Sequence, residues 1–400
     1  MDSIGGKSPQ RLRSSSASTT STFIPTPSTS ISGGTALPSL GQPTPSLPTA
    51  PSAPLPVTTL SATSWRTEYP RIGQFAMTEE DEIIAAVPSG LLHFKRVNDH
   101  NSRPWSEGRL LPNTTMLNDS SVSGLAAISI GASLYVYCVS GGTLHSFYRS
   151  TEDKSSWVKD FRPPFPNYPI SGTPAVASSS QRWNLVVPCQ SGGLLHTSTN
   201  GSSISRSYSS ERRFWEPVDH VAKDLGIISS VSIAAIRHKT RYRYGSPEDK
   251  DLVMVCVASG RLHTAEGELS QLSFRPVKWE AQAPTRILHP GEVTGNPMLI
   301  KNGSEDQLDL LVPSAEGGIF HFVRTASTPD EWHMIARVAF PQGLPATSCL
   351  AFHSDRSYSR DFRALIQSGG QIYYVTTTES SKPWSGSYLR PILSPGPFFG

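Results

Sequence analysis

Arginine and tryptophan recur together in three segments of the chain, with acidic residues close by. The candidate binding residues are Arg96 and Trp105, then Arg149, Glu152 and Trp157, and finally Arg324, Glu331 and Trp332. A guanidinium fork and a carboxylate hydrogen-bond rigid hydroxyl groups well, and an aromatic ring packs on an apolar C–H face. The combination predicts non-covalent binding of a rigid polar ligand.

These residues belong to a unit that occurs six times. Each unit has an apolar run, a glycine-containing turn, a strand that carries His or Tyr, and a Trp 11 to 19 residues further on. The pairs are His93 and Trp105, His145 and Trp157, His196 and Trp215, His263 and Trp279, His321 and Trp332, and Tyr373 and Trp384. Self-similarity at about 50 residues is typical of circular arrays with one small sheet per repeat.

Each repeat is consistent with four antiparallel strands, which make one blade of a β-propeller. A short strand of small residues is followed by an apolar strand, a glycine hairpin, the strand with the His, and an outer strand opened by the Trp. The fold class is therefore predicted to be all-β, with six blades favoured. Residues 64–70 resemble one more outer strand, which leaves seven blades as the alternative.

The first 62 residues differ from the rest of the chain. They are mostly Ser, Thr and Pro, and Phe23 is their only aromatic residue. Such a segment buries too little apolar surface to offset its ordering entropy, so residues 1–62 are predicted to be a disordered tail before a propeller at 63–400. No signal-peptide core and no apolar run of about 18 residues is visible, which favours a cytoplasmic or non-classically secreted protein without a membrane span.

The sequence contains no recognised catalytic or metal-binding motif. Gly-x-Ser-x-Gly, His-Glu-x-x-His and a phosphate-cradling glycine loop are all missing, and residues 153–157 are one residue short of the Asp-box turn of sialidases. Glycosidases of ordinary type need two carboxylates roughly 5 to 10 Å apart, and the acids here show no such placement. The repeated His residues would lie on separate blades and could not converge on one metal ion. We expect no catalytic residues, no metal and no cofactor.

The repeat pattern of residues 63–400 resembles the sugar-binding β-propellers, namely the six-bladed fungal fucose-specific lectins and the seven-bladed bacterial propeller lectins. This resemblance implies pockets between adjacent blades, where Arg and Glu hydrogen-bond sugar hydroxyls and a Trp or Tyr stacks on the sugar. It implies that the Arg and Trp residues of the three segments above bind a glycan or glycoprotein. No Glu recurs at one consistent position across the repeats.

Structural roles compete with these binding roles. A Trp at the start of each outer strand also suits a wedge packed between blades, and the repeated His suits a hydrogen bond to a neighbouring turn. The net charge of +3 does not indicate a nucleic-acid partner, although the insertion at 237–250 is basic and aromatic and could contact an acidic partner or RNA. The alternative to a lectin-like protein is a non-catalytic scaffold that binds protein partners.

Overall fold

The computed structural model describes residues 57–59, 61–62, 73–78, 82–95, 105–106, 108–118, 120–130, 133–150, 157–160, 164–179, 182–200, 215–236, 251–268, 277–279, 285–302, 307–325, 328–340, 349–354, 362–368, 371–376, 384 and 388–391. The chain divides into two compact units, Met1–Ala53 and Pro54–Gly400. All described residues belong to the second unit.

The described strands form six sheets, numbered here by their order along the chain. The first contains β3 (Phe75–Met77), β4 (Glu82–Val87), β5 (Gly90–Lys95) and β6 (Arg109–Leu110). The second contains β7 (Val122–Ile130), β8 (Ser133–Ser140), β9 (Thr143–Ser150) and β10 (Trp157–Asp160). The third contains β11 (Ala175–Ser179), β12 (Arg182–Pro188), β13 (Leu194–Asn200) and β14 (Asp219–Val221).

The other sheets follow the same order from inner to outer strand. The fourth contains β15 (Ile228–Ile236), β16 (Asp251–Ala258), β17 (Arg261–Glu268) and β18 (Lys278–Trp279), with β19 (Thr285–Ile287) also paired with β17. The fifth contains β20 (Met298–Asn302), β21 (Gln307–Pro313), β22 (Ile319–Thr325) and β23 (Thr328–Ala339). The sixth contains β24 (Cys349–Ser354), β25 (Phe362–Ser368), β26 (Gln371–Thr376) and β27 (Tyr388–Pro391).

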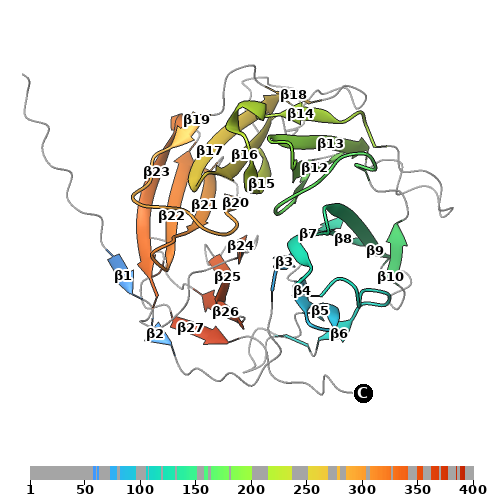
Figure 1. Ribbon diagram of the computed structural model, residues 1–400. Coiled ribbons are helices and arrows are strands. Elements are labelled where there is room, and N and C mark those ends of the chain that lie inside the picture. Colours follow the sequence, from blue (N-terminus) through green and yellow to red (C-terminus); the bar gives the residue numbers. More distant parts are fainter. Residues whose placement is uncertain are drawn as a thin grey trace, which may run out of the picture. The chain divides into compact units, whose positions relative to one another are not determined.

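These sheets confirm an all-β propeller built from four-stranded antiparallel blades. In the described part of the chain the helical content is the short 3-10 turn η2 (Lys223–Leu225). The inner strands contact one another in the order β3, β7, β11, β15, β20 and β24, and β24 contacts β3. Figure 1 shows the sheets arranged around a common axis.

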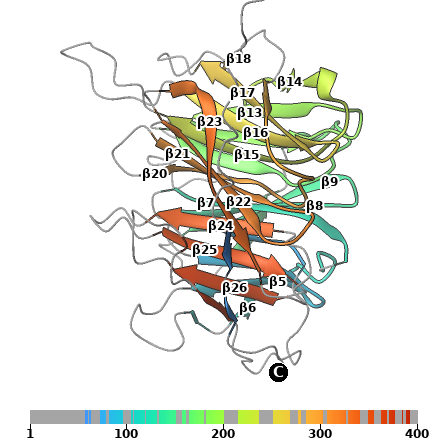
Figure 2. The same ribbon diagram turned by 90° about the vertical axis from the view of Figure 1, so that its left-hand side faces the viewer.

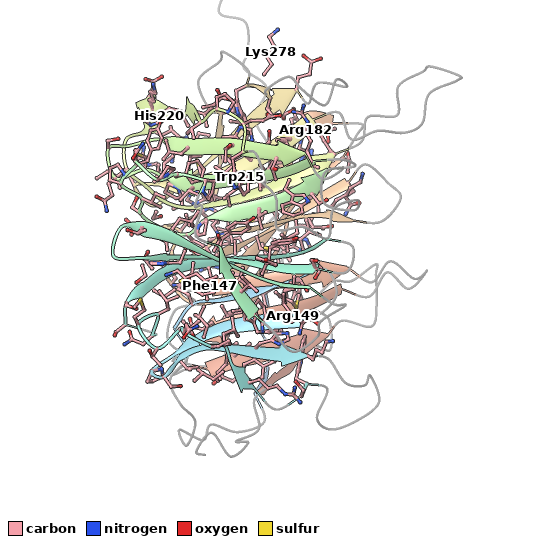
Figure 3. The ribbon with its side chains drawn as sticks, turned by 90° about the vertical axis from the view of Figure 1, so that its right-hand side faces the viewer. Phe147, Arg149, Arg182, Trp215, His220 and Lys278 are labelled. Atoms are coloured by element: carbon pink, nitrogen blue, oxygen red, sulfur yellow. The ribbon has the colours of Figure 1, made fainter. Side chains whose placement is uncertain are left out.

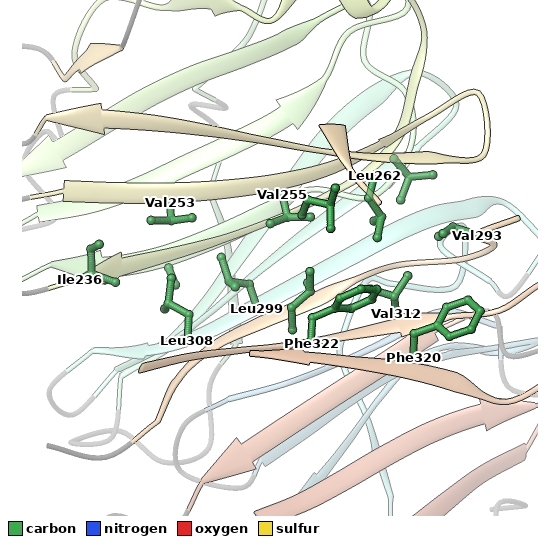
Figure 4. Close-up of a cluster of buried hydrophobic side chains, with 14 residues drawn as sticks. Ile236, Val253, Val255, Leu262, Val293, Leu299, Leu308, Val312, Phe320 and Phe322 are labelled. Carbon is green, nitrogen blue, oxygen red and sulfur yellow. The ribbon is translucent and has the colours of Figure 1, made fainter. Parts of the chain in front are cut away.

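The second strand of each sheet forms the core. β4 and β12 are buried along their whole length, because both faces of these strands are covered by neighbouring sheets. The apolar clusters lie between sheets: Val253 and Val255 of the fourth sheet pack with Phe320 and Phe322 of the fifth (Figure 4). The continuous apolar runs in the sequence follow from this double burial.

A cavity of about 80 Å³ lies between inner strands of the first five sheets. Three polar side chains that precede the inner strands are joined beside it. Thr173 Oγ1 donates to Asn296 Oδ1 at 2.8 Å, and Asn296 Nδ2 donates to Gln74 Oε1 at 2.9 Å. These bonds link the third, fifth and first sheets.

The glycine hairpins are of two lengths. Ser140 pairs directly with Thr143, so Gly141 and Gly142 form a two-residue turn, whereas the last pair of β21 and β22 is Pro313 with Ile319. Cys138, Cys189 and Cys256 each precede the repeat's His by seven residues, and this spacing predicts one shared position in three repeats. Because the hairpins differ in length, the three cysteines do not share one position. Cys138 and Cys256 are paired opposite the repeat's His, but Cys189 lies in the hairpin after β12. All three thiols are buried and free.

The segment before the first sheet differs from the predicted tail. β1 (Val57–Thr59) pairs in parallel with β23, and β2 (Ser61–Ala62) pairs in parallel with β27, so these residues extend the fifth and sixth sheets (Figure 1). Figure 2 faces this side, where the long strand β23 runs along the outside. The rest of the predicted tail, the strand-like residues 64–70 and the insertion at 237–250 lie outside the described residues.

Candidate functional site

Arg149 lies between the first and second sheets. It is paired directly opposite Trp157 on the neighbouring strand, and its guanidinium carbon is 5.5 Å from the centroid of that ring. Its Nη2 donates to both carboxylate oxygens of Glu82 on β4, at 3.0 and 2.9 Å. An Arg, a Glu and a Trp are thus brought together across a sheet boundary.

Glu82 is the centre of this group. Its carboxylate also contacts His93 Nε2 at 3.2 Å and Lys95 Nζ at 3.3 Å. Burial by itself would raise the pKa of Glu82, but the hydrogen bonds and positive charges of His93 and Arg149 lower that pKa from 4.5 to about 2. Glu82 is therefore ionised at neutral pH and acts as a hydrogen-bond acceptor.

Arg149 keeps one unused donor in this group. Its Nε is buried and has no hydrogen-bond partner among the described residues. A buried donor without a partner is unfavourable by about 1–3 kcal/mol. Because this atom is covered by protein, a ligand hydroxyl or carbonyl oxygen accepts this hydrogen bond only after neighbouring side chains move.

A second group of the same composition lies between the fourth and fifth sheets. Arg324 Nη1 is 2.5 Å from Glu266 Oε1, and the guanidinium carbon is 5.9 Å from the Trp332 ring centroid. Arg324 is buried, whereas about a quarter of the Glu266 side chain is exposed (27%). This group is therefore more open to solvent than the one around Glu82.

A third group lies on the third sheet, where the sequence showed no matching arginine. Arg182 begins β12 and pairs with Asn200, which is four residues after His196, just as Arg149 is four residues after His145. Arg182 Nη1 is 3.4 Å from Glu216 Oε1, and Ser198 Oγ donates to the other oxygen of Glu216. Trp215 is next to Glu216 in the sequence and therefore faces the opposite side of the sheet, where its ring makes an edge contact with Tyr137 of the second sheet. Figure 3 shows Arg149 and Arg182 on neighbouring sheets, with Trp215 on the third.

The predicted site residues are thus only partly brought together. Arg149 with Trp157 and Arg324 with Trp332 form the pairs that were expected, whereas Arg96 and Glu152 lie outside the described residues. Glu331 is exposed and pairs with His333 instead of Arg324. Adjacent residues of a strand face opposite sides, so Glu331 points away when Trp332 faces Arg324. Trp105 is buried in the core of the first sheet.

The acids that pair with Arg149 and Arg324 were missed in the sequence because they precede the arginines by a whole repeat. They also come from different strands, Glu82 from a second strand and Glu266 from a third. No constant spacing connects them. The available signal for Glu82 was a charged residue at the start of an otherwise apolar strand.

The repeated His residues are structural in three sheets. His93, His196 and His321 hydrogen-bond Glu82, Asn184 and Asp309 on the neighbouring strand of their own sheets, respectively. On their other side, His196 and His321 accept hydrogen bonds through Nδ1 from Trp279 and Trp384 of the next sheet. His93 has an edge contact with Trp157. Trp279 and Trp384 therefore pack as wedges between blades, as one of the two expected roles requires. Trp157 and Trp332 lie beside arginines, and their stacking on a sugar stays a prediction.

Solved structures with the same fold come from fungi and bacteria. The six-bladed fucose-recognising lectin of Aleuria aurantia is 13% identical over 82% of this chain and 97% of its own, with a TM-score of 0.52. The lectin BP39L of Burkholderia pseudomallei is 14% identical over 78% and 83%, with a TM-score of 0.53. A triple arginine-to-alanine variant of AofleA from Arthrobotrys oligospora is 11% identical over 84% and 95%, with a TM-score of 0.52.

These similarities concern the fold. No family model and no curated protein sequence matches the chain. In the described part of the chain, none of the helices is long and apolar enough to span a membrane. The same residues contain no group of His, Cys, Asp and Glu that could hold a metal ion.

Proposed function

We propose that this protein is a non-catalytic carbohydrate-binding propeller whose sites are the Arg–Glu–Trp groups at Arg149 and Arg324 and the Arg–Glu pair at Arg182. The arrangement at Arg149 carries the proposal: a buried guanidinium joins an ionised carboxylate and an indole ring, and its Nε lacks a partner in the described structure. The guanidinium donor, the carboxylate acceptor and the indole ring then match a pyranose. Its hydroxyls need donors and acceptors, and its C–H face needs an aromatic ring.

The charge state of Glu82 supports binding over catalysis. A glycosidase needs one carboxylic acid that carries a proton near neutral pH. The lowered pKa of Glu82, caused by His93 and Arg149 against the effect of burial, keeps this residue unprotonated. It would accept hydrogen bonds from sugar hydroxyls and would not protonate a leaving group.

We further propose six blades in one closed ring and fucose as the preferred sugar. The continuous contacts from β3 through β24 and back to β3 support the closed ring. The likeness in fold to a lectin of Aleuria aurantia, described as six-bladed and fucose-recognising, supports both proposals.

The test is binding of the whole chain to a glycan array, followed by competition with free fucose, galactose and mannose. We expect saturable binding that fucose inhibits most strongly. In the triple variant Arg149→Lys, Arg182→Lys and Arg324→Lys, we expect affinity to fall at least tenfold. Lysine keeps the charge that neutralises each Glu but loses the planar fork of donors. Arg109→Lys, at an exposed position on β6, is the matched control and should bind normally.

Two results would contradict the proposal. Undiminished binding by a folded triple variant would mean that the sites lie elsewhere. A folded protein that binds no glycan would favour the scaffold alternative, in which the Arg–Glu pairs only hold neighbouring blades together.

A further inference from the structure

Four basic side chains gather at one end of the fourth sheet. Arg261 and His263 alternate on β17 and so face the same side, and Arg286 of β19 is paired directly opposite His263. His289 follows three residues after Arg286 and is close enough to these groups for their charges to act on it. The strand register therefore brings two arginines and an imidazole to one face of the sheet.

The acid that would neutralise this charge is missing in the fourth sheet. In the first, third and fifth sheets, the His has a polar partner on the second strand of its sheet. This partner stands two residues before the residue that is paired with the His, and it is Glu82, Asn184 or Asp309. His263 is paired with Cys256 and faces the third sheet, whereas those three His residues face the sheet that follows. Two residues before Cys256 is Met254, which is fully buried and cannot neutralise charge. The Nδ1 atom of His263 is buried and has no hydrogen-bond partner among the described residues.

No described acid forms an ion pair with the two arginines of the cluster. Arg261 and Arg286 are both exposed and make no ion pair with a described residue. Glu316 beside the 289–291 turn is already paired with Arg337. Glu292 is exposed and lies near Arg261, since Val293 N–H donates to Gly260 O, but it forms no ion pair with a described residue. Burial lowers the pKa of His263, and the charges of Arg286, Arg261 and His289 lower it further. Protonation of His263 is therefore disfavoured in this cluster.

We propose that Arg261, His263, Arg286 and His289 form a binding site for an oxyanion, the sulfate or phosphate group of an esterified ligand. Arginine binds such groups through two parallel N–H···O bonds, and an imidazole N–H supplies a further donor. This site is separate from the groups at Arg149, Arg182 and Arg324, in which each guanidinium is already paired with a carboxylate. The proposal does not depend on sugar binding by those groups.

The test is a titration of the whole chain, labelled with ¹³C in its histidine rings, with glucose 6-sulfate and glucose 6-phosphate. Unsubstituted glucose tests whether the charge is required. We expect saturable shifts of the His263 and His289 ring signals with an ester, no shift with glucose, and no shift of His145. Whichever ester binds more tightly identifies the source of the oxyanion.

The double variant Arg261→Ala and Arg286→Ala is expected to bind the ester at least tenfold more weakly. Both side chains are exposed, so folding should be retained. Lys278→Ala removes another exposed cation of the same sheet and should bind as the unmodified protein does. The proposal is overturned if neither ester gives saturable shifts, if glucose gives the same shifts, or if the double variant binds as tightly as Lys278→Ala.

Discussion

A single carboxylate, Glu82, is contacted by three basic side chains at the boundary of two sheets. His93 and Lys95 belong to its own sheet, and Arg149 belongs to the next. A buried ion pair of this kind contributes little net stability when complete, because desolvation offsets the attraction. Loss of one partner is different, since an unpaired charge then remains buried.

The lowered pKa of Glu82 predicts a defined acid sensitivity. A carboxylate whose pKa is lower in the folded state contributes stability above its unfolded pKa of 4.5, and this contribution is lost as the pH falls toward the folded value of about 2. We expect the free energy of unfolding in urea to fall over that interval. In Glu82→Gln this pH dependence should be weaker, and stability at pH 7 should be lower by about 3–5 kcal/mol. An unchanged pH profile in the variant would contradict the assigned pKa.

The backbone geometry of the glycine hairpins restricts which residues these turns accept. Gly141 and Gly318 both have positive φ angles, of 57° and 84°, which disfavour any side chain. Their surroundings differ. A Cβ at Gly141 would meet nothing within 4 Å, whereas a Cβ at Gly318 would overlap the carbonyl oxygen of Val338 on the adjacent outer strand.

This difference predicts unequal effects of one substitution. Gly141→Ala should destabilise the protein by about 1 kcal/mol, the strain of a left-handed backbone. Gly318→Ala should destabilise it by about 3 kcal/mol or more, because β23 must also move away from the turn. Equilibrium unfolding in urea would measure both values. Equal losses would show that backbone strain alone makes glycine necessary in these turns.

Across the whole molecule, the segment at 57–62 connects the outer edges of two sheets. β1 contributes three residue pairs to β23, and β2 contributes two to β27. These parallel strands cover edges that would otherwise present unpaired backbone groups. Sequence composition placed this segment in the tail, because strand pairing on an edge needs no apolar side chains.

Two truncated chains distinguish the contribution of the tail to stability from that of β1 and β2. A chain that begins at residue 54 should unfold like the full chain, because β1 and β2 are retained. A chain that begins at residue 63 loses both strands and should be less stable by about 2 kcal/mol, given about 1 kcal/mol or less for each net hydrogen bond. Thermal unfolding of the two truncated proteins provides the comparison. Equal melting temperatures would mean that the added strands contribute no stability.

The sequence by itself determined the fold class and the repeat. Glycine turns, apolar second strands and a recurring His and Trp are local patterns, and each recurs because every blade meets the same packing requirements. The pairs Arg149 with Trp157 and Arg324 with Trp332 were also visible, since each pair lies on adjacent strands of one repeat.

Only the tertiary structure decided which acids meet these arginines. Glu82 and Glu266 come from the preceding sheets. In the third sheet β13 has no arginine at the position equivalent to Arg149, and Arg182 of the neighbouring strand β12 supplies the guanidinium instead. These contacts depend on strand register and on which face of a sheet meets its neighbour. Neither is encoded at a constant spacing, because a one-residue change of register reverses the direction of every side chain.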